Sequence, residues 1–468
     1  GVWTLTVNDP YNGDGGSVNA FSLKICNKVA ITPIPVLTSN TINVVATSTT
    51  ILSNSDLSAT STAQTDLQQT YTLLETPILG NLKKNGTNLV VGNIFTQKDI
   101  NDGIITYTNT ESTTTSTTFK VDVKNANNGW IPSRTVTINI IPCGSVTTSW
   151  NGSAWSNGTP TKTTAVTFTG NYNSTSNLEA CSITINTGIN VVVNSGHTFT
   201  TNGIVTVNGI GTFTVNNDAA LKQIDPTVVN IGNIIVKRNS ASMVRLDYTA
   251  WSSPVSGQQL QSFSPNTIAT RFYQYLFTGT TTPTAYQSVS ATNNFIVGKG
   301  YMIRAANDWP ITPTAFNGQF TGVPTNGKVS HSVGIGYNLL GNPYAAPIDA
   351  RAFLTSNPSI GTLYFWTHTI AAVGSTYPQN NYASYTTLGG VASAAGGAVP
   401  NGTIQTGQGF FINATPAGNA SFFNTQRVNA SVSTQFYRNS NEITTINENE
   451  KHRIWLNLND NVNSYNQI

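Results

Sequence analysis

The sequence has little charge and few cysteines. Only 9% of its 468 residues are Asp, Glu, Lys or Arg, against roughly 25% in an ordinary soluble domain. The net charge of +3 comes from 22 basic and 19 acidic residues without a basic cluster. This disfavours nucleic-acid binding, because phosphate neutralisation needs a concentrated group of Lys and Arg. No run of eighteen apolar residues occurs, so the sequence predicts no transmembrane segment.

The three cysteines are Cys26, Cys143 and Cys181. An odd number leaves at least one thiol free or paired outside this chain. No C-x-x-C spacing occurs, which argues against a zinc site. Cys143 and Cys181 flank the first part of one predicted domain and form a candidate disulfide in an oxidising compartment.

Two copies of one short motif organise the rest of the sequence, namely Gly298–Ala305 and Gly407–Ala414. Each reads G-x-G, aromatic, apolar, Ile, polar, Ala. Because side chains alternate along a strand, Tyr301, Ile303 and Ala305 would share one face, as would Phe410, Ile412 and Ala414. The paired glycines suit a close approach of backbones before a buried strand. Neither motif precedes a helical pattern, so phosphate binding at a helix N-terminus is unsupported.

The chain as a whole predicts an all-β fold, because short alternating runs recur between turn residues and no long helical period appears. We expect tandem β-sandwich and short β-solenoid domains with an internally duplicated β module. The predicted parts are a hairpin at 1–27, a sandwich at 28–142, a solenoid-like segment at 143–222, a duplicated module at 223–430 with repeats of about 246–322 and 335–428, and a linker with the start of a further β domain at 431–468.

Residues 1–27 pair two alternating runs around a loop rich in Gly, Asn and Asp. The pattern W-x-L-x-V-x-D, G-D-x-G, F-x-L-x-I resembles the end of the proprotein-convertase P domain, a β-sandwich. The resemblance implies that Asp9 and Asp14 are candidate calcium ligands. The alternative is that both carboxylates only make turns.

The stretch Phe95–Tyr107 resembles the cadherin-like repeat of the chondroitin-sulfate-proteoglycan type, which has F-T-Q-x-D-I-x-x-G-x-I-x-Y ahead of a strand pair. The family's acidic strand start is absent here, where Ser116–Phe119 carries no carboxylate. Asp99 and Asp102 are secondary calcium candidates, and capped turns are the alternative explanation.

Two further segments resemble proteins of Gram-negative bacteria that leave the cell by type IX secretion. The first is Trp150–Pro160, W-N-G-S-A-W-S-N-G-T-P, ahead of stacked short runs of Val, Ile and Thr. The second is the duplicated module, where W-S-S-P (251–254) matches L-G-N-P (340–343) and R-F-Y-Q-Y (271–275) matches T-L-Y-F-W (362–366). We also match Phe316 with Phe422. The module resembles the one that precedes the type IX sorting domain, which implies the secretion translocon as a partner during export.

No catalytic constellation is evident in the sequence. The four histidines are scattered and no G-x-S-x-G elbow occurs, so we expect no enzymatic activity within this chain. Aromatic rings beside amides suit glycan contact, and Trp309 and Trp366 are the candidates. Trp309, between Asp308 and Pro310, is the aromatic expected to be exposed. The alternative is that the aromatics fill cores.

The sequence therefore predicts a non-catalytic stalk, adhesion or display region of a secreted or cell-surface protein. Its expected place is extracellular, or on the outer-membrane surface of a Gram-negative bacterium. Glycans or cell-surface components would be its partners, and calcium is the only cofactor considered. Two alternatives stay open: the accessory region of a P-domain-linked secreted protease, whose catalytic domain would lie upstream, and a carbohydrate-binding module.

Overall fold

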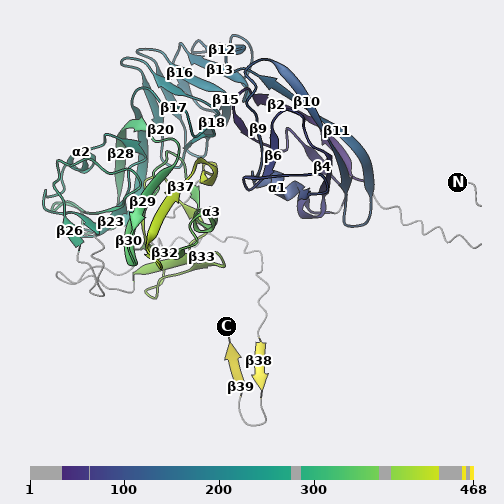
Figure 1. Cartoon of the computed structure of the whole chain (residues 1–468). Helices are drawn as coiled ribbons and strands as arrows, with labels where there is room; N and C mark the ends of the chain where they lie inside the picture. The colour runs from purple at the N-terminus through teal and green to yellow at the C-terminus, as the bar shows by residue number, and fades with distance from the viewer. Residues whose placement is uncertain are drawn as a thin grey trace, which may run out of the picture. The chain divides into compact units, whose positions relative to one another are not determined.

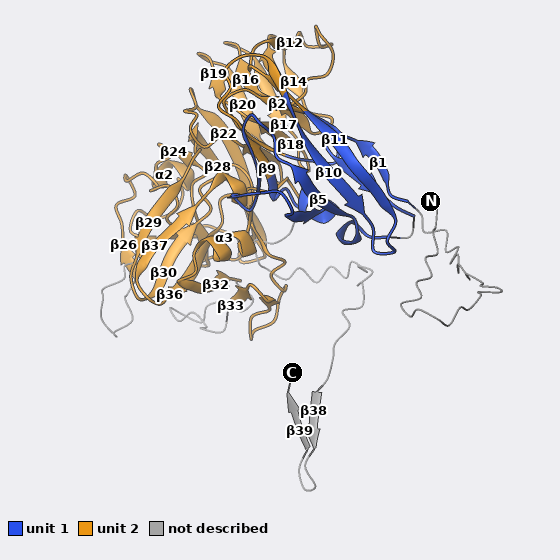
Figure 2. Cartoon of the chain, turned by 45° about the vertical axis from the view of Figure 1, so that its right-hand side comes forward, with its two compact units in different colours: residues 1–42, 52–105, 117–137 blue, residues 43–51, 106–116, 138–468 orange. Residues whose placement is uncertain are grey.

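The computed structural model describes residues 34–62, 64–275, 286–367 and 381–431, together with the backbone of 456–459 and 464–467. The predicted hairpin at 1–27, with Asp9 and Asp14, lies outside the described residues. About 49% of the structure is strand and about 6% is helix, which confirms the all-β class. Two compact units are distinguished in Figure 2: residues 1–42, 52–105 and 117–137, and residues 43–51, 106–116 and 138–468.

The strands from Val36 to Ile141 form three sheets. The largest contains β2 (Thr41–Val45), β11 (Trp130–Ile141), β10 (Thr115–Lys124), β5 (Thr70–Glu75) and β8 (Ile94–Thr96). The second contains β3 (Thr49–Ile51), β9 (Ile105–Thr108), β6 (Asn81–Lys84) and β7 (Thr87–Asn88), and the third pairs β1 (Val36–Ser39) with β4 (Ser58–Thr60). Two short helices, η1 (Asp66–Gln68) and α1 (Gln97–Asn101), lie between strands. Burial alternates along β10, as expected for a strand with one face in a core.

Residues 146–223 form a short β-solenoid of about four turns with parallel sheets (Figure 1). One sheet stacks β12 (Val146–Trp150), β13 (Thr164–Phe168), β16 (Ser182–Ile185) and β19 (Val205–Val207). A second stacks β15 (Leu178–Ala180), β18 (Thr198–Thr201) and β21 (Ala220–Gln223), and a third begins with β14 (Tyr172–Asn173), β17 (Asn190–Val193) and β20 (Thr212–Val215). Phe168, Phe199 and Phe213 are fully buried and stack from turn to turn inside it.

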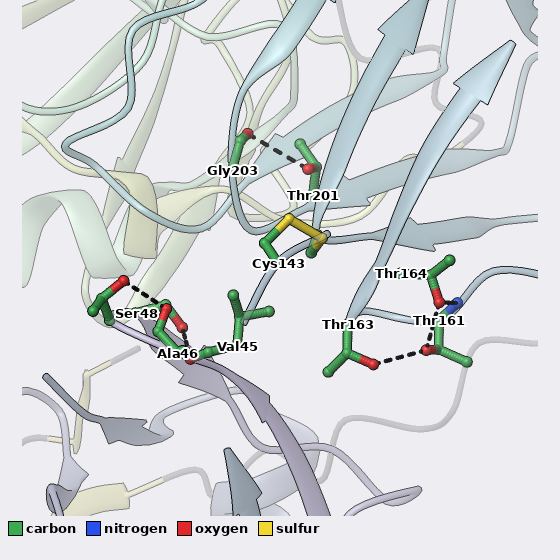
Figure 3. The surroundings of a disulfide bond; sticks show 11 residues. Val45, Ala46, Ser48, Cys143, Thr161, Thr163, Thr164, Thr201 and Gly203 are labelled. Carbon is green, nitrogen blue, oxygen red and sulfur yellow. Dashed lines mark hydrogen bonds between the residues drawn. A yellow bond between two sulfur atoms is a disulfide. The ribbon is translucent and has the colours of Figure 1, made fainter. Parts of the chain in front are cut away.

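A disulfide joins Cys143 to Cys181 across the first turns of the solenoid, with Cα atoms 5.7 Å apart (Figure 3). This is the pairing considered from the sequence. Cys181 is fully buried, and its backbone continues the parallel stack on both sides. Its N–H donates to the Thr164 carbonyl at 2.8 Å, and its carbonyl accepts from the Gly203 N–H at 2.7 Å. The disulfide therefore attaches the segment before β12 to a residue that lies between two neighbouring turns of the solenoid.

The solenoid continues into the duplicated module without a break. Its third sheet extends from β20 through β22 (Ile234–Met243) and β28 (Thr314–Pro324) to β24 (Val255–Ser256). One hydrophobic core also spans both parts, since Phe168 and Phe213 belong to the same cluster as Trp251 and Phe320. The predicted boundary between 222 and 223 falls inside β21, and the parts of the chain on its two sides share one sheet and one core.

The duplicated module contains two copies of one arrangement, called copy 1 (246–322) and copy 2 (335–428) below. The central sheet of copy 1 has the order β23 (Tyr248–Trp251), β27 (Tyr301–Arg304), β25 (Phe272–Tyr275) and β26 (Tyr286–Ser288), and helix α2 (Leu260–Phe263) follows β24. That of copy 2 has the order β30 (Gly336–Gly341), β36 (Gly409–Ala414), β32 (Ile360–Trp366), β33 (Tyr382–Thr386) and β34 (Gly389–Val391).

Two further features of copy 1 recur within or just before copy 2, namely a short helix after a short strand and an antiparallel strand pair. Helix α3 (Ala350–Ser356) follows β31 (Ile348–Asp349), which pairs with β35 (Thr403–Ile404). Strand β29 (Val329–Val333) pairs with β37 (Gly418–Phe422) as β22 pairs with β28. The short helix η2 (Asn424–Gln426) follows β37, and a separate hairpin joins β38 (Leu456–Asn459) to β39 (Ser464–Gln467).

The strand register confirms the sequence match between the copies residue by residue. Trp251 pairs with Tyr301 in copy 1, and the matched Leu340 pairs with Phe410 in copy 2. The match of 271–275 with 362–366 also holds, because Tyr273 pairs with Met302 and Tyr364 with Phe411. The predicted inward faces are confirmed as well, since Tyr301 and Ile303 lie in one core and Phe410, Ile412 and Ala414 in another.

One proposed match is wrong. The residue of copy 1 that corresponds to Phe422 is Phe320 rather than Phe316. Phe320 packs against Phe263 of α2 with centroids 4.3 Å apart, and Phe422 packs against Phe353 of α3 with centroids 4.8 Å apart. The sequence match failed because β28 is longer than β37 and carries an additional aromatic residue at its start.

The two copies exchange backbone contacts through their glycine motifs. Bridges join Trp251 to Gln408 and Lys299 to Leu340, so each motif contacts the leading strand of the other copy. A Cβ atom on Gly300 would lie 2.5 Å from the Leu340 carbonyl oxygen. The predicted close backbone approach is therefore present, and it joins the copies. No helix in the described part of the chain is long and apolar enough to cross a membrane.

Candidate functional site

The carboxylates proposed as secondary calcium ligands are engaged with lysines and a helix cap. Asp99 accepts hydrogen bonds from the backbone N–H of Thr96 and from Lys84 Nζ, both at 2.7 Å. Asp102 pairs with Lys98 Nζ at 2.8 Å, one turn earlier on α1. These contacts are those of capped turns, the alternative stated above. No group of three or more His, Cys, Asp or Glu is placed to hold a metal ion among the described residues.

Trp309 is half-buried rather than exposed, which corrects the prediction made for it. Its indole N–H donates to the Met243 carbonyl at 3.3 Å, and its ring lies against Phe316 with centroids 5.9 Å apart. It lines a small cavity of about 90 Å³. A tryptophan next to proline in a loop can still cover apolar surface, because its large ring gains more from burial than any other side chain.

Trp366 belongs to an aromatic cluster between the two copies. Ala250 and Met302 of copy 1 and Leu339 and Phe411 of copy 2 form the buried centre of this cluster. Partly buried aromatic side chains surround it: Tyr248, Tyr273, Tyr275, Tyr364, Trp366 and Tyr382. The copies therefore pack by the sheet faces opposite to their own cores. The alternation of the strands predicted these faces, but it did not predict that they would meet.

Hydroxyl groups link the edge of this cluster. The hydroxyl oxygens of Tyr286 and Tyr382 are 3.1 Å apart, and both rings pack edge-on against Phe411. Burial raises the pKa of the Tyr382 hydroxyl, and the neighbouring Tyr286 adds to the rise. Trp366 packs against Tyr382 with centroids 5.0 Å apart. The Trp366 ring therefore packs in the interface between the two copies.

An open pocket of about 520 Å³ lies at the end of copy 1 where α2 meets β28. This volume is within the range of about 300–1,000 Å³ typical of small-molecule sites. Its walls include the rings of Phe263 and Phe316 and the amides of Gln258, Asn317 and Gln319. None of the residues that line it is charged. We call it the α2 pocket.

Strand geometry places the polar wall of the α2 pocket. Asn317, Gln319 and Thr321 alternate with the buried Gly318, Phe320 and Gly322 along β28, so all three side chains point outward on one face. The side-chain amides of Asn317 and Gln319 are exposed and make no hydrogen bond within the described part of the chain. They are therefore available to a ligand.

The opposite wall is held rigidly. Gln258 is only 6% exposed, and its Oε1 accepts from the Thr321 N–H at 2.7 Å while its Nε2 donates to the Gln259 carbonyl at 2.9 Å. Gln259 in turn accepts from the Ser262 hydroxyl at 3.0 Å. These bonds tie the start of α2 to β28. This wall of the pocket is thus formed by residues that are hydrogen-bonded to one another.

The cavity beside Trp309 adjoins the α2 pocket, because Pro265 and Phe316 line both. Of the two tryptophans predicted from the sequence, Trp309 therefore lies beside this pocket, whereas Trp366 lies in the cluster between the copies. Phe263, Phe316, Asn317 and Gln319 were missed as site residues. The signal was the alternation N-x-Q-x-T at 317–321, which reads as one polar face of a strand.

Two family models match this chain. Residues 35–140 match the cadherin-like model, which agrees with the resemblance seen at Phe95–Tyr107. Residues 142–468 match the model of a domain of unknown function, DUF8693. The chain belongs to the DUF8693 family. No curated protein matches the chain.

The DUF8693 match begins one residue before Cys143, so it includes the disulfide, the solenoid and both copies of the module. This extent agrees with the shared sheet and shared core described above. The DUF8693 region is thus built as a solenoid that continues into a duplicated β module, and the α2 pocket is part of it.

Proposed function

We propose that this chain is a non-catalytic adhesion or display region of a secreted or cell-surface protein. The observation that carries the proposal is the tandem order of a cadherin-like domain and a DUF8693 region. Cadherin-like domains suit adhesion and the separation of other domains from a surface. A β-rich module cross-linked by a disulfide suits a role outside the cell, where disulfides persist. Export by a type IX route is part of the same proposal, and it rests on the resemblance of Trp150–Pro160 and of the duplicated module to proteins exported that way.

The amide-rich surface supports contact with neutral partners. Only 9% of residues are charged, so long-range electrostatic attraction contributes little to association. Short-range hydrogen bonds and aromatic contacts would then carry recognition. The α2 pocket offers both kinds of group, which favours the carbohydrate-binding alternative as a component of adhesion.

The test is a retention assay with beads that carry the purified 1–468 chain. Under flow over a mucin-coated surface, we expect these beads to be retained more strongly than beads coated with serum albumin. Retention equal to that of albumin beads would contradict the adhesive role. Turnover of a peptide or glycoside substrate by the purified chain would contradict the non-catalytic role.

A further inference from the structure

We propose that the α2 pocket binds a neutral pyranose sugar, with Phe316 against one face of the ring and the amides of Asn317 and Gln319 on its hydroxyls. Sugar binding would give the proposed adhesive role a ligand class, and its biological meaning rests on that proposed role. The binding event itself can be measured without it.

The chemistry of the lining selects this class of ligand. A pyranose has a C–H face that packs on an aromatic ring and a rim of hydroxyls that both donate and accept hydrogen bonds. Phe316 is half-buried and belongs to the opposite face of β28 from Asn317 and Gln319. It lines the same pocket because residues 317–321 pair with β22 but not with β24, which leaves an edge of the sheet beside α2 where side chains of both faces border the opening. Carboxamides both donate and accept, so Asn317 and Gln319 match hydroxyls without a charge. A lining without charged residues gives a phosphate or carboxylate ligand no counter-charge.

The aromatic wall is fixed in place by its neighbours. Phe316 packs edge-on against Phe263 at 5.5 Å and against Trp251 at 5.9 Å between centroids. Trp309 packs on it at 5.9 Å from the adjoining cavity. Phe263 itself stacks on Phe320 at 4.3 Å. A ring with three aromatic neighbours loses little conformational freedom when a ligand packs on it, which favours binding.

Copy 2 provides an internal comparison, because its register identifies the corresponding positions. Val236 pairs with Phe320 and Val329 with Phe422, so positions 316 and 317 of β28 correspond to Gly418 and Asn419 of β37. Copy 2 thus has no aromatic side chain where copy 1 has Phe316. It also has Asp349 as the helix N-cap where copy 1 has Gln259. The aromatic and neutral character of the α2 pocket is therefore specific to copy 1.

The experiment is saturation-transfer-difference NMR on the 1–468 chain with millimolar glucose, galactose, N-acetylglucosamine, fucose and glucuronate. We expect at least one of the four neutral sugars to bind more tightly than glucuronate. Asn317→Ala and Gln319→Ala should each weaken that binding about tenfold, as expected for loss of a ligand hydrogen bond. Phe316→Leu, which keeps apolar bulk but removes the ring, should weaken it similarly.

Asn419→Ala is the matched control, since it removes the same exposed amide from the corresponding position of copy 2 and should leave binding unchanged. Thermal unfolding of each variant checks that the fold is retained. The proposal is overturned if none of the neutral sugars binds, if glucuronate binds most tightly, or if Asn419→Ala weakens binding as much as Asn317→Ala.

The bead assay separates this inference from the adhesive role. If the beads are retained and neither Asn317→Ala nor free sugar reduces their retention, the adhesive role is supported but depends on another surface than the α2 pocket. If the chain binds a sugar but the beads are not retained, sugar binding by the α2 pocket is supported and the adhesive role is contradicted.

Discussion

Ser252 donates its backbone N–H to the carbonyl of Gly407 at 2.9 Å, which joins the leading strand of copy 1 to the glycine motif of copy 2. The reciprocal bond runs from the Gly341 N–H to the Gly298 carbonyl at 3.0 Å. Since Ser252 corresponds to Gly341 and Gly407 to Gly298, the two bonds are related by the internal repeat. An approximate two-fold axis therefore passes between Ser252 and Gly341.

Only one of the two residues at this axis has room for a side chain. A Cβ atom on Gly341 would lie 2.2 Å from Ser252 Cβ and 2.6 Å from its Oγ. We expect Gly341→Ala to destabilise the protein by about 1–3 kcal/mol, the usual cost of overpacking. The change would be measured as a lower urea midpoint of unfolding.

Two variants control the Gly341 measurement. Gly361→Ala, at a site with no heavy atom within 4 Å of the added Cβ, should leave the midpoint nearly unchanged. Adding Ser252→Gly to Gly341→Ala should restore most of the loss, because it removes the clashing atoms. Equal loss in the single and double variants would contradict the axis contact.

The disulfide should contribute strongly to the stability of the DUF8693 region. Cys143 and Cys181 are 38 residues apart, and the chain-entropy model assigns a closed loop of this size a stabilisation of about 4 kcal/mol. We expect a reducing agent to lower the thermal midpoint of the native protein. The double variant Cys143→Ser with Cys181→Ser should melt at the lower temperature whether or not reductant is present. A native midpoint that does not respond to full reduction would count against this role.

Alkaline pH should unfold the protein through its buried tyrosines. Burial raises the pKa of Tyr107 and of Tyr344 to about 12, whereas an unfolded tyrosine titrates near 10. Between these values the folded state binds more protons than the unfolded state, so stability is full below about pH 10 and falls as pH rises toward 12.

Arg427 modifies this alkaline behaviour in the opposite direction. Its guanidinium lies 4.0 Å from the centre of the Tyr344 ring, and burial lowers its pKa to about 10. Because the pKa of Arg427 is lower in the folded than in the unfolded state, this group counteracts part of the loss of stability at alkaline pH. Because several buried tyrosines oppose one arginine, we expect the thermal midpoint to decrease above pH 10. The midpoint would be measured by circular dichroism. Tyrosinate absorbance should rise together with unfolding, and a midpoint constant to pH 12 would refute the prediction.

Calcium binding remains a prediction for the N-terminal residues Asp9 and Asp14. Melting the chain with calcium and with EGTA tests it, and we expect a lower midpoint in EGTA if those carboxylates hold the ion. Because Asp99 and Asp102 already pair with lysines, Asp99→Asn should not alter the difference between the two conditions. An identical midpoint in both conditions would remove the calcium site.

Local pattern was sufficient for much of this protein. The all-β class and the inward faces of the glycine-motif strands follow from alternation, because a strand has a strict period of two. The match of 271–275 with 362–366 followed from the same order of motifs in both copies. The motif at Phe95–Tyr107 was specific enough to identify a cadherin-like domain. The pairing of Cys143 with Cys181 could be named as a candidate because these cysteines flank one segment.

The tertiary structure decided which of these elements contact one another. Alternation shows that Phe411 points away from the core of its own copy, but its contact with Tyr275 and Tyr286 depends on how the two sheets face each other. The exchange of bonds between Ser252 and Gly407 likewise joins residues 155 positions apart. Such long-range contacts depend on the packing of complete sheets, which no local pattern encodes. For the same reason Trp309 was expected to be exposed, and the α2 pocket became apparent only once α2 lay against β28.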